Sequence, residues 1–538
     1  MAQPEPERTA LVVGAGLVGT LCSAMLAARG WTVTLLEGRA DPRVGSASAR
    51  ARSINLALSP RGIEALRSVS PELVERVLEQ GIEMRGRMVH KNVSSRVDKM
   101  PQDYGLVQEG EVIRSISRTQ LGIELLDHVD RLPSQGPGSV TTRFNTKLVD
   151  MDVRGAGSVQ VTLSTHGDST PSREQYDFVI GADGAYSKVR RELMRNSHAR
   201  FDYRQFYARH SYLELSIPAG PDNSFSIEPN YLHIWPRGEF MLIALANLDK
   251  SFTLTLFAYE TTFKSLDAAL KELEQDDPNP VVELFRKEFP DAFELMGEQA
   301  LLQSWRENPK DGLITVECSP YHYENKVLLI GDSAHAMVPF YGQGMNCGFE
   351  DVRVLSSILD HFEASPVPLT PSPLPYSSTA PRLSPQESSR TETTISERLS
   401  LALSSYTKIR ARSLEAIQRL AHENYTEMAS SVLSPLYLVR LSLDRLLSRV
   451  FTVPGLRGEA RDKSQGGIRD RGATWESLYR MTTFRCGLAY EEVIRRRQWQ
   501  GRVLERVVQV TSGLVVGALV AGLGWYTRIP SRYRLVRV

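Results

Sequence analysis

The sequence predicts an α/β protein in which a largely parallel sheet is combined with a second, antiparallel sheet. Three observations support this prediction. A glycine-rich turn joins a short apolar strand to a helix near the start of the chain. Two further buried-strand patterns, Tyr176 to Ile180 and Lys326 to Ile330, run into turns that contain Gly and Asp. Between these two, residues 210 to 259 form short strand-like runs separated by turn residues, which is typical of antiparallel pairing.

Length and composition set limits on the function. The chain has 538 residues, more than one compact domain usually holds. Its 64 basic and 63 acidic side chains leave a net charge of +1, so we expect no nucleic-acid partner. The four cysteines are too few and too scattered for a disulfide framework or a Cys-x-x-Cys metal site. We therefore expect reduced thiols and no bound metal, and the composition leaves the oligomeric state open.

The first elements form one βαβ unit. Thr9 to Val13 is an apolar run of buried-strand length, Leu17 to Arg29 has helical composition, and Thr32 to Leu36 is a β-branched strand. This order predicts two neighbouring parallel strands with a crossover helix, the start of a Rossmann-type domain.

The turn inside this unit carries a dinucleotide-binding pattern. Gly14, Gly16 and Gly19 form G-x-G-x-x-G between strand and helix. Glycines let the backbone approach a pyrophosphate, whose charge the helix N-terminus favours. Glu37 ends the second strand, where its carboxylate can accept a hydrogen bond from a ribose hydroxyl. Together these residues predict a bound dinucleotide.

Two later motifs indicate which dinucleotide is bound. Gly181 to Arg190 follows one buried strand, and Gly331 to His335 follows the other. Asp332 is placed to accept hydrogen bonds from ribityl hydroxyls, and the helix start at 342–346 can direct N–H groups at a flavin ring. Either Asp alone would be explained as a helix cap, and His335 is expected to pack or bond the backbone. In this order the motifs predict an FAD-dependent aromatic hydroxylase.

The order of the three motifs resembles that of the group A flavoprotein monooxygenases, whose type fold is that of para-hydroxybenzoate hydroxylase. Three stretches, Arg52 to Ser59, Arg85 to His90 and Pro339 to Asn346, are similar to the kynurenine 3-monooxygenase family. The similarity runs from about residue 9 to 362 and resumes near 415. It implies hydroxylation of L-kynurenine to 3-hydroxy-L-kynurenine with NADPH and O2, through a flavin C4a-hydroperoxide. It also implies a location in the mitochondrial outer membrane.

The resemblance assigns FAD contacts residue by residue. They fall on Gly14, Gly16, Gly19, Glu37, Arg39, Ala57, Arg118, Leu148, Asp183, Asp332, Met345 and Asn346. The family's substrate contacts correspond to Arg87, Tyr104, Asn424 and Tyr479, with Pro339, Phe340 and Tyr341 expected to wall the ring site.

The residue types suit this chemistry. An amino-acid substrate needs an anchor for its carboxylate, and an arginine is bidentate and always charged. The flavin carries the difficult step, so we assign no catalytic side chain. Without the resemblance, a surface ion pair explains Arg87 better than a functional role. The stretch from Arg87 to Tyr104 is a few residues longer than in the family, and a loop at 454–472 is inserted before Tyr479.

NADPH is expected to bind transiently. A separate NADPH domain would need a second strand, G-x-G-x-x-G turn and helix. The sequence contains no other such unit. We therefore expect NADPH to deliver hydride on the FAD-binding and substrate domains and to leave.

These patterns divide the chain into predicted regions. The FAD-binding domain is expected at 1–200 and 301–362, and the substrate domain at 201–300 with a part near 80–110. Residues 363–398 are rich in Pro, Ser and Thr and predict a disordered loop, followed by a helical region at 399–506. Residues 507–527 carry no charge and are flanked by arginines and aromatics, so they predict a transmembrane anchor. A glycine-rich core helix is the alternative there.

Other functions remain open at this point. One is a different group A hydroxylase or a membrane-attached epoxidase. An anchor at Arg87 and Tyr104 would be useless for the hydrocarbon substrate of a squalene-type epoxidase. The other is a flavin-bearing interaction protein whose Pro/Ser/Thr-rich loop recruits partners. The latter would bind FAD without substrate-stimulated NADPH oxidation.

Overall fold

The fold is taken from a computed structural model of the chain. It describes residues 8–44, 55–93, 96–104, 111–133, 136–155, 157–196, 200–274, 277–367, 369, 394–430, 432, 434–450, 475–506 and 509. The loops predicted at 363–398 and 454–472 and the segment at 507–527 lie wholly or mostly outside these residues. The predicted domain boundaries stay predictions.

The first sheet has six strands, and the glycine-rich turn lies at its centre. Its strand order is β18 (His322–Tyr323), β19 (Val327–Leu329), β12 (Phe178–Gly181), β1 (Thr9–Val13), β2 (Thr32–Leu36) and β8 (Ser139–Arg143). All neighbouring pairs are parallel except β18 with β19. The near-continuous apolar character of β1, β12 and β19 follows from this position, because helices cover both faces of a parallel sheet.

The carboxyl ends of β1, β12 and β19 all meet at one edge of this sheet. Each of these strands leads into a turn and then a helix: α1 (Leu17–Ala27), α6 (Lys188–Asn196) and α11 (Asp332–His335). In open α/β sheets ligands bind at this edge. Further helices of this region are α3 (Pro60–Val69), α4 (Pro71–Glu79), α5 (Arg118–Asp130) and α12 (Gly344–His361).

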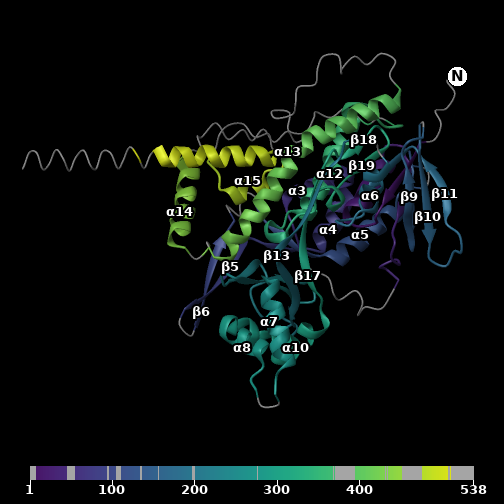
Figure 1. The fold of residues 1–538 in the computed structure, drawn as a ribbon. Coiled ribbons are helices and arrows are strands. Elements are labelled where there is room, and N and C mark those ends of the chain that lie inside the picture. Colours follow the sequence, from purple (N-terminus) through teal and green to yellow (C-terminus); the bar gives the residue numbers. More distant parts are fainter. Residues whose placement is uncertain are drawn as a thin grey trace, which may run out of the picture.

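Two small antiparallel sheets were not predicted. One contains β3 (Asn55–Leu58), β7 (Ile113–Ser117) and β4 (Ile82–Met84). The other contains β9 (Thr146–Asp152), β10 (Val159–Thr165) and β11 (Ser172–Tyr176), and Figure 1 shows it at the right of the view, beyond α6.

The second large sheet has seven strands and is mixed rather than antiparallel. Its order is β17 (Lys310–Ser319), β13 (Asp202–Ile217), β16 (Phe252–Tyr259), β15 (Phe240–Ala246), β14 (Tyr231–Pro236), β5 (Gly86–Val93) and β6 (Arg96–Asp103). The strands predicted between 210 and 259 are present, and β5 adds to them in parallel with β14. This pairing brings Arg87 opposite Leu232.

Helices cover one face of this sheet and leave the other face for the site. These helices are α7 (Glu260–Lys271), α8 (Pro280–Glu288), α9 (Pro290–Met296) and α10 (Glu298–Glu307), and Figure 1 shows α7, α8 and α10 grouped beyond the sheet. Trp235, Phe252, Phe285 and Trp305 form a separate core between the helices and the sheet. Side chains alternate between the two faces of a strand, so the strand residues that do not enter this core point toward the first sheet.

The C-terminal helices pack back onto the first region. α13 (Ile395–Ala429) is followed by α14 (Pro435–Val450), α15 (Leu478–Phe484) and a helical stretch at 490–506. Arg410 of α13 makes buried ion pairs with Glu350 and Asp351 of α12, at 2.9 and 2.7 Å. Arg61 of α3 bonds Glu350 and the carbonyl oxygens of Thr482 and Leu488. These contacts fix the C-terminal helices against the dinucleotide-binding region.

The predicted membrane anchor requires a correction. Among the residues that the structure describes, no helix is long and apolar enough to span a bilayer. The predictions of a C-terminal anchor and of a mitochondrial outer membrane location are therefore withdrawn.

Candidate functional site

A cavity of about 360 Å³ lies where the two large sheets face one another. Its walls come from the turns after β1, β12 and β19, from the inner face of the second sheet, and from the segment 337–345. Ten of the predicted site residues line this cavity: Gly16, Ala57, Arg87, Arg118, Asp332, Pro339, Phe340, Tyr341, Met345 and Tyr479.

The glycine-rich turn fits a ligand that approaches its backbone closely. Gly14 has φ +105°, and a Cβ there would lie 2.5 Å from the carbonyl oxygen of Ala182. A Cβ on Gly19 would lie 2.0 Å from the carbonyl oxygen of Gly14. By contrast, a Cβ on Gly16 would meet no described atom within 4 Å, and Gly16 lines the cavity. Gly14 and Gly19 thus shape the turn, and Gly16 leaves room for a phosphate at the start of α1.

Two aspartates lie at the same edge of the first sheet. Asp183 Oδ2 accepts the backbone N–H groups of Lys188 (2.6 Å) and Val189 (3.1 Å). Its Oδ1 is buried without a partner among the described residues, and burial raises the pKa of this carboxyl group. The Asp332 side chain is exposed to the cavity at the first residue of α11. Both carboxyl groups therefore have acceptor capacity that hydroxyl groups of a cofactor can use.

Three predicted cofactor residues lie at a different place. Glu37 follows β2, and its Oε1 accepts hydrogen bonds from the backbone N–H and Nε of Arg39 at 3.0 and 2.9 Å. Leu148 is buried on β9, two residues after Thr146, whose N–H donates to the Glu37 carbonyl. None of Glu37, Arg39 and Leu148 lines the cavity. They form a group at the carboxyl end of β2, where the adenosine half of a dinucleotide lies in Rossmann-type folds.

Asn346 has a different arrangement from the one expected of a contact residue. Its Nδ2 donates to the carbonyl oxygens of Ala57 (2.9 Å) and Gly342 (2.8 Å), and its Oδ1 accepts the N–H of Ser59 (2.9 Å). The side chain is fully buried. It therefore holds two cavity segments together, and Met345 beside it faces the cavity.

Arg87 is a buried cation enclosed by aromatic rings. Its guanidinium lies 4.3 Å from the centre of the Tyr479 ring, and Tyr479 stacks on Tyr104 with a centroid distance of 4.9 Å. Burial lowers the pKa of Arg87, but Tyr479, Tyr437, Tyr104 and Glu427 outweigh this effect and the pKa is raised. The guanidinium is therefore charged. Its Nε is buried without a hydrogen-bond partner among the described residues.

Tyr104 supplies a protonated hydroxyl beside this cation. Burial raises its pKa well above the ordinary value, so the group remains a donor at neutral pH. The hydroxyl oxygen is buried and makes no well-formed hydrogen bond to a described residue. Orphaned buried polar groups of this kind are costly unless a ligand satisfies them.

The segment Pro339 to Tyr341 forms the short 3-10 helix η2 and closes one side of the cavity. Asn424 of α13 donates from Nδ2 to the Phe340 carbonyl at 2.7 Å. Tyr341 stacks on Tyr479 at 5.8 Å. Asn424 does not line this cavity, so the structure places it behind the wall rather than in it.

Several wall residues were missed in the sequence. They are Tyr212, Leu232, Met241, Ile243, Leu245, Thr255 and Phe257 on β13–β16, and Met428 in the last turn of α13. Met241, Ile243 and Leu245 lie on one face of β15 because side chains alternate along a strand. Every residue from Phe240 to Ala246 is apolar, so the sequence does not mark which face of this strand lines a cavity.

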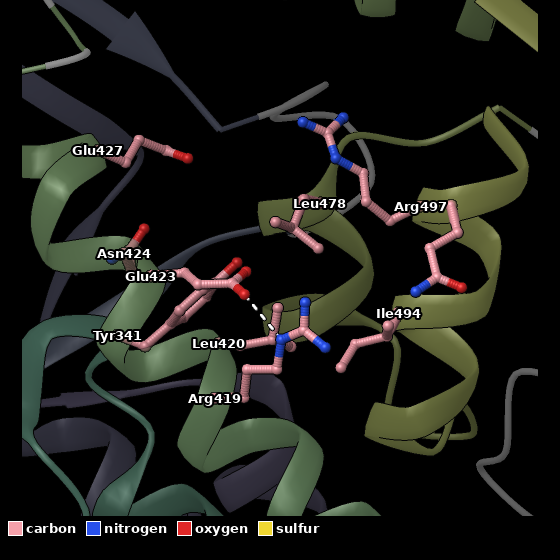
Figure 2. Close-up of a pocket in the computed structure, with 10 residues that line it drawn as sticks. Tyr341, Arg419, Leu420, Glu423, Asn424, Glu427, Leu478, Ile494 and Arg497 are labelled. Carbon is pink, nitrogen blue, oxygen red and sulfur yellow. Dashed lines mark hydrogen bonds and ion pairs between the residues drawn. The ribbon is translucent and has the colours of Figure 1, made fainter. Parts of the chain in front are cut away.

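A second, smaller cavity of about 240 Å³ lies behind Tyr341 (Figure 2). α13 contributes Arg419, Glu423, Asn424 and Glu427 to it, and the opposite wall contains Leu478, Ile494 and Arg497. Arg419 pairs with Glu423 at 2.7 Å, as the dashed line in Figure 2 shows. Because Tyr341 lines both spaces, we call this second cavity the side pocket.

His335 at the end of α11 lies close to Cys347 and Asp351 of α12, but the chemistry of the three side chains does not favour a metal. Asp351 already accepts the N–H of Gly331 and pairs with Arg410 and His335. Burial raises the pKa of the Cys347 thiol, so the thiolate ligand form is disfavoured. His335 thus bonds a carboxylate, whereas packing or a backbone bond was predicted.

The sequence matches a known family model, the FAD binding domain, over residues 7–216 and 233–364. Curated relatives match nearly the whole chain. A protein named kynurenine 3-monooxygenase from Cryptococcus neoformans is 39% identical over 533 residues, covering 96% of each chain. Proteins with the same name from Yarrowia lipolytica and Candida albicans are 40% and 38% identical, covering 94% and 98% of this chain and 96% and 100% of theirs.

Solved structures agree on the fold. The tetrameric form of 2-methyl-3-hydroxypyridine-5-carboxylic acid oxygenase superposes with a TM-score of 0.55 at 18% identity, covering 80% of this chain and 95% of that one. PqsL from Pseudomonas aeruginosa, described as a probable FAD-dependent monooxygenase, also superposes with a TM-score of 0.55. It is 17% identical, and the match covers 81% of this chain and 99% of PqsL. At these identities the likeness supports the fold alone.

Proposed function

The chain belongs to the kynurenine 3-monooxygenase family of FAD-dependent aromatic monooxygenases, and on that premise we propose that Arg87 anchors the carboxylate of L-kynurenine in the central cavity. Members of this family hydroxylate L-kynurenine to 3-hydroxy-L-kynurenine with NADPH and O2. Bound FAD supplies the redox chemistry, because it accepts hydride and reacts with O2. The protein's own residues must bind the cofactor, orient the aromatic ring and exclude water.

The proposed FAD site follows the edge of the first sheet. Gly16 and the start of α1 would hold the pyrophosphate, and Gly14 and Gly19 shape the turn. Glu37, Arg39 and Leu148 would hold the adenosine end. Asp183 and Asp332 offer carboxylate oxygens to the linking hydroxyl groups, and Ala57, Arg118, Met345 and Asn346 lie at or behind the cavity wall where the flavin ring would lie.

The proposed substrate site follows from one observation, the buried charge of Arg87 inside an aromatic enclosure. A carboxylate that enters the cavity would meet the guanidinium and the Tyr479 ring at the cavity wall. Tyr104 does not line the cavity, but its ring stacks on Tyr479, and in our proposal its buried hydroxyl turns to the carboxylate. A bidentate contact would fix the amino-acid end, so that the aniline ring points between Phe340 and the apolar strand residues. Asn424 contributes by holding the Phe340 carbonyl.

The test is NADPH consumption by the purified FAD-loaded protein with and without L-kynurenine, with the product identified by mass. We expect L-kynurenine to stimulate consumption and to gain one oxygen atom. NADPH oxidation that does not respond to L-kynurenine, with no hydroxylated product, would contradict the function.

A further inference from the structure

We propose that Glu427 recognises the α-ammonium group of the substrate and that, before substrate binds, the same carboxylate serves as the counter-ion of Arg87. The inference rests on the proposed role of Arg87 and adds a specificity-determining residue to it. It would explain how the site selects an amino acid rather than a simple aromatic carboxylic acid.

The first argument is the position of Glu427. Its Oε1 lies 3.6 Å from Nη1 of Arg87, within ion-pair distance but longer than a hydrogen bond. The Glu427 side chain is 30% exposed, whereas that of Arg87 is 6% exposed. Glu427 also lines the side pocket, where Figure 2 shows it projecting from α13. Glu427 does not line the central cavity, so its carboxylate lies between the side pocket and the buried cation that faces the central cavity.

The second argument concerns the loose fit of this ion pair. Arg87 can donate in a bidentate manner, yet its Nε is without a partner and Glu427 approaches from one side only. Tyr437 donates to the same Oε1 at 3.3 Å, and no hydrogen bond from a described residue reaches Oε2. A substrate carboxylate can thus take the guanidinium without removing a well-formed contact.

The third argument is the geometry of an α-amino acid. A single carbon atom joins its carboxylate and its ammonium group, so a carboxylate bound at Arg87 carries the ammonium into the immediate surroundings of Glu427. Placing a second carboxylate beside Arg87 would otherwise repel Glu427, whereas a zwitterion brings its own positive charge. The pair Arg87 and Glu427 is complementary to a zwitterion in both sign and spacing.

No competing acceptor of the same kind lies nearby among the described residues that line the two cavities. Their carboxylates are Asp332, Glu423 and Glu427. Asp332 belongs to the proposed cofactor edge, and Glu423 is paired with Arg419. Glu427 is the remaining anion, and it is the one that contacts the substrate arginine.

The experiment compares two ligands on the FAD-loaded protein without NADPH, using the change in flavin absorbance to measure Kd. The ligands are L-kynurenine and its desamino analogue, 4-(2-aminophenyl)-4-oxobutanoate, which lacks the ammonium group. The proteins are the unmodified chain, Glu427→Gln, and the control Glu423→Gln, which alters a carboxylate one helical turn earlier on α13.

We expect the unmodified protein and Glu423→Gln to bind L-kynurenine more tightly than the analogue. In Glu427→Gln this preference should fall at least about tenfold, because L-kynurenine loses its ammonium partner. The analogue should bind Glu427→Gln more tightly than it binds the unmodified protein, because its carboxylate no longer faces a second anion. If Glu427 had a purely structural role, Glu427→Gln would weaken the binding of both ligands by a similar factor.

Two results would overturn the inference: an unchanged preference in Glu427→Gln, or equal Kd values for the two ligands in the unmodified protein. The second comparison needs no variant, so it decides the matter even if Glu427→Gln does not fold. Failure of the unmodified protein to bind either ligand would instead overturn the proposed function together with this inference.

Discussion

At the scale of single residues, Arg87 combines features that are rarely found together in a residue that does not bind a ligand. It is buried and charged, it faces a cavity, and an aromatic ring covers its guanidinium. A buried charge is normally paired and hydrogen-bonded. Here the pairing is completed by the substrate carboxylate in our proposal.

Replacement of Arg87 tests this directly. Arg87→Ala should weaken L-kynurenine binding by about 2–5 kcal/mol, a rise in Kd of at least about 30-fold, because a desolvated charge pair is broken. FAD content should stay normal, since Arg87 is not assigned to the cofactor. Titration of the flavin absorbance measures both quantities, and an unchanged Kd for L-kynurenine would contradict the anchor.

His322 gives a prediction for the pH dependence of stability. Nδ1 of this residue, on β18, is hydrogen-bonded to the Thr407 hydroxyl at 2.7 Å. Burial and, to a smaller extent, the positive charge of Lys408 lower the pKa of His322 to about 4. In the unfolded chain the His322 imidazole has an ordinary pKa near 6.5. Between about pH 6.5 and pH 4 the unfolded chain therefore binds a proton at His322 that the folded chain does not bind. The resulting stability is complete above about pH 6.5 and is lost as the pH falls toward 4.

We expect this residue to account for about 1–2 kcal/mol of lost stability between pH 7.5 and pH 5. The urea midpoint measured at both pH values checks the prediction. His322→Asn should lose less stability over this interval than the unmodified protein. The same pH dependence in both proteins would show that His322 does not contribute.

At the scale of elements, α13 connects the two cavities to the dinucleotide-binding region. Its Arg410 is fully buried between Glu350 and Asp351, whereas Arg419 pairs with Glu423 on the surface of the helix. These two arginines lie on the same helix but differ in the solvation of their partners. A buried pair and an exposed pair therefore can be compared within one element.

Removing the buried Arg410 should destabilise the protein far more than removing the exposed Arg419. Arg410→Ala should destabilise the protein by about 3–5 kcal/mol, because two buried carboxylates each lose a cationic partner. Glu350 would keep its pairs with Arg61 and Arg353, and Asp351 would keep its pair with His335 and the Gly331 N–H. Arg419→Ala should change stability by less than about 1 kcal/mol. Thermal or urea unfolding measures both, and similar midpoints for the two variants would contradict the role of Arg410 in fixing α13.

How much of this the sequence could predict depends on how local each feature is. The first βαβ unit lies within a residue or two of its predicted bounds, and β14, β15 and β16 all fall within the predicted strand region 210–259, because apolar runs and turn residues encode them locally. The parallel pairing of β5 with β14 joins residues far apart in the chain and has no local signal. Consequently the second sheet was predicted as antiparallel and is mixed.

The site shows the same division. The glycines and Asp332 were found because a motif carries them, and Arg87, Tyr104 and Tyr479 came from resemblance alone. Their grouping depends on β5, β6 and α15 meeting in space, which the structure provides. Glu427 was missed because one carboxylate on a long amphipathic helix looks like an ordinary solvated residue.

At the scale of the whole molecule, the cavity belongs to neither large sheet alone. Gly16 and Asp332 come from the first region, Met241 and Phe257 from the second sheet, and Tyr479 from the C-terminal helices. A ligand bound at Arg87 therefore touches elements that also form the proposed flavin site. Binding can shift the position of the flavin or of its surroundings only because these elements share one space.

This arrangement predicts that substrate controls the reaction with NADPH. The sequence contains one strand–G-x-G-x-x-G–helix unit, so NADPH must react transiently on surfaces that FAD and substrate also use. L-kynurenine should accelerate reduction of the bound flavin, and a mimic that fills the Arg87 site but cannot be hydroxylated should stimulate NADPH oxidation and release hydrogen peroxide. Stopped-flow absorbance of the flavin after mixing with NADPH measures the first effect, and a peroxide assay measures the second.

Arg87→Ala is the control, because at the same ligand concentration its flavin should be reduced at the ligand-free rate. Equal rates of flavin reduction with and without L-kynurenine in the unmodified protein would show that the shared cavity does not couple the two events.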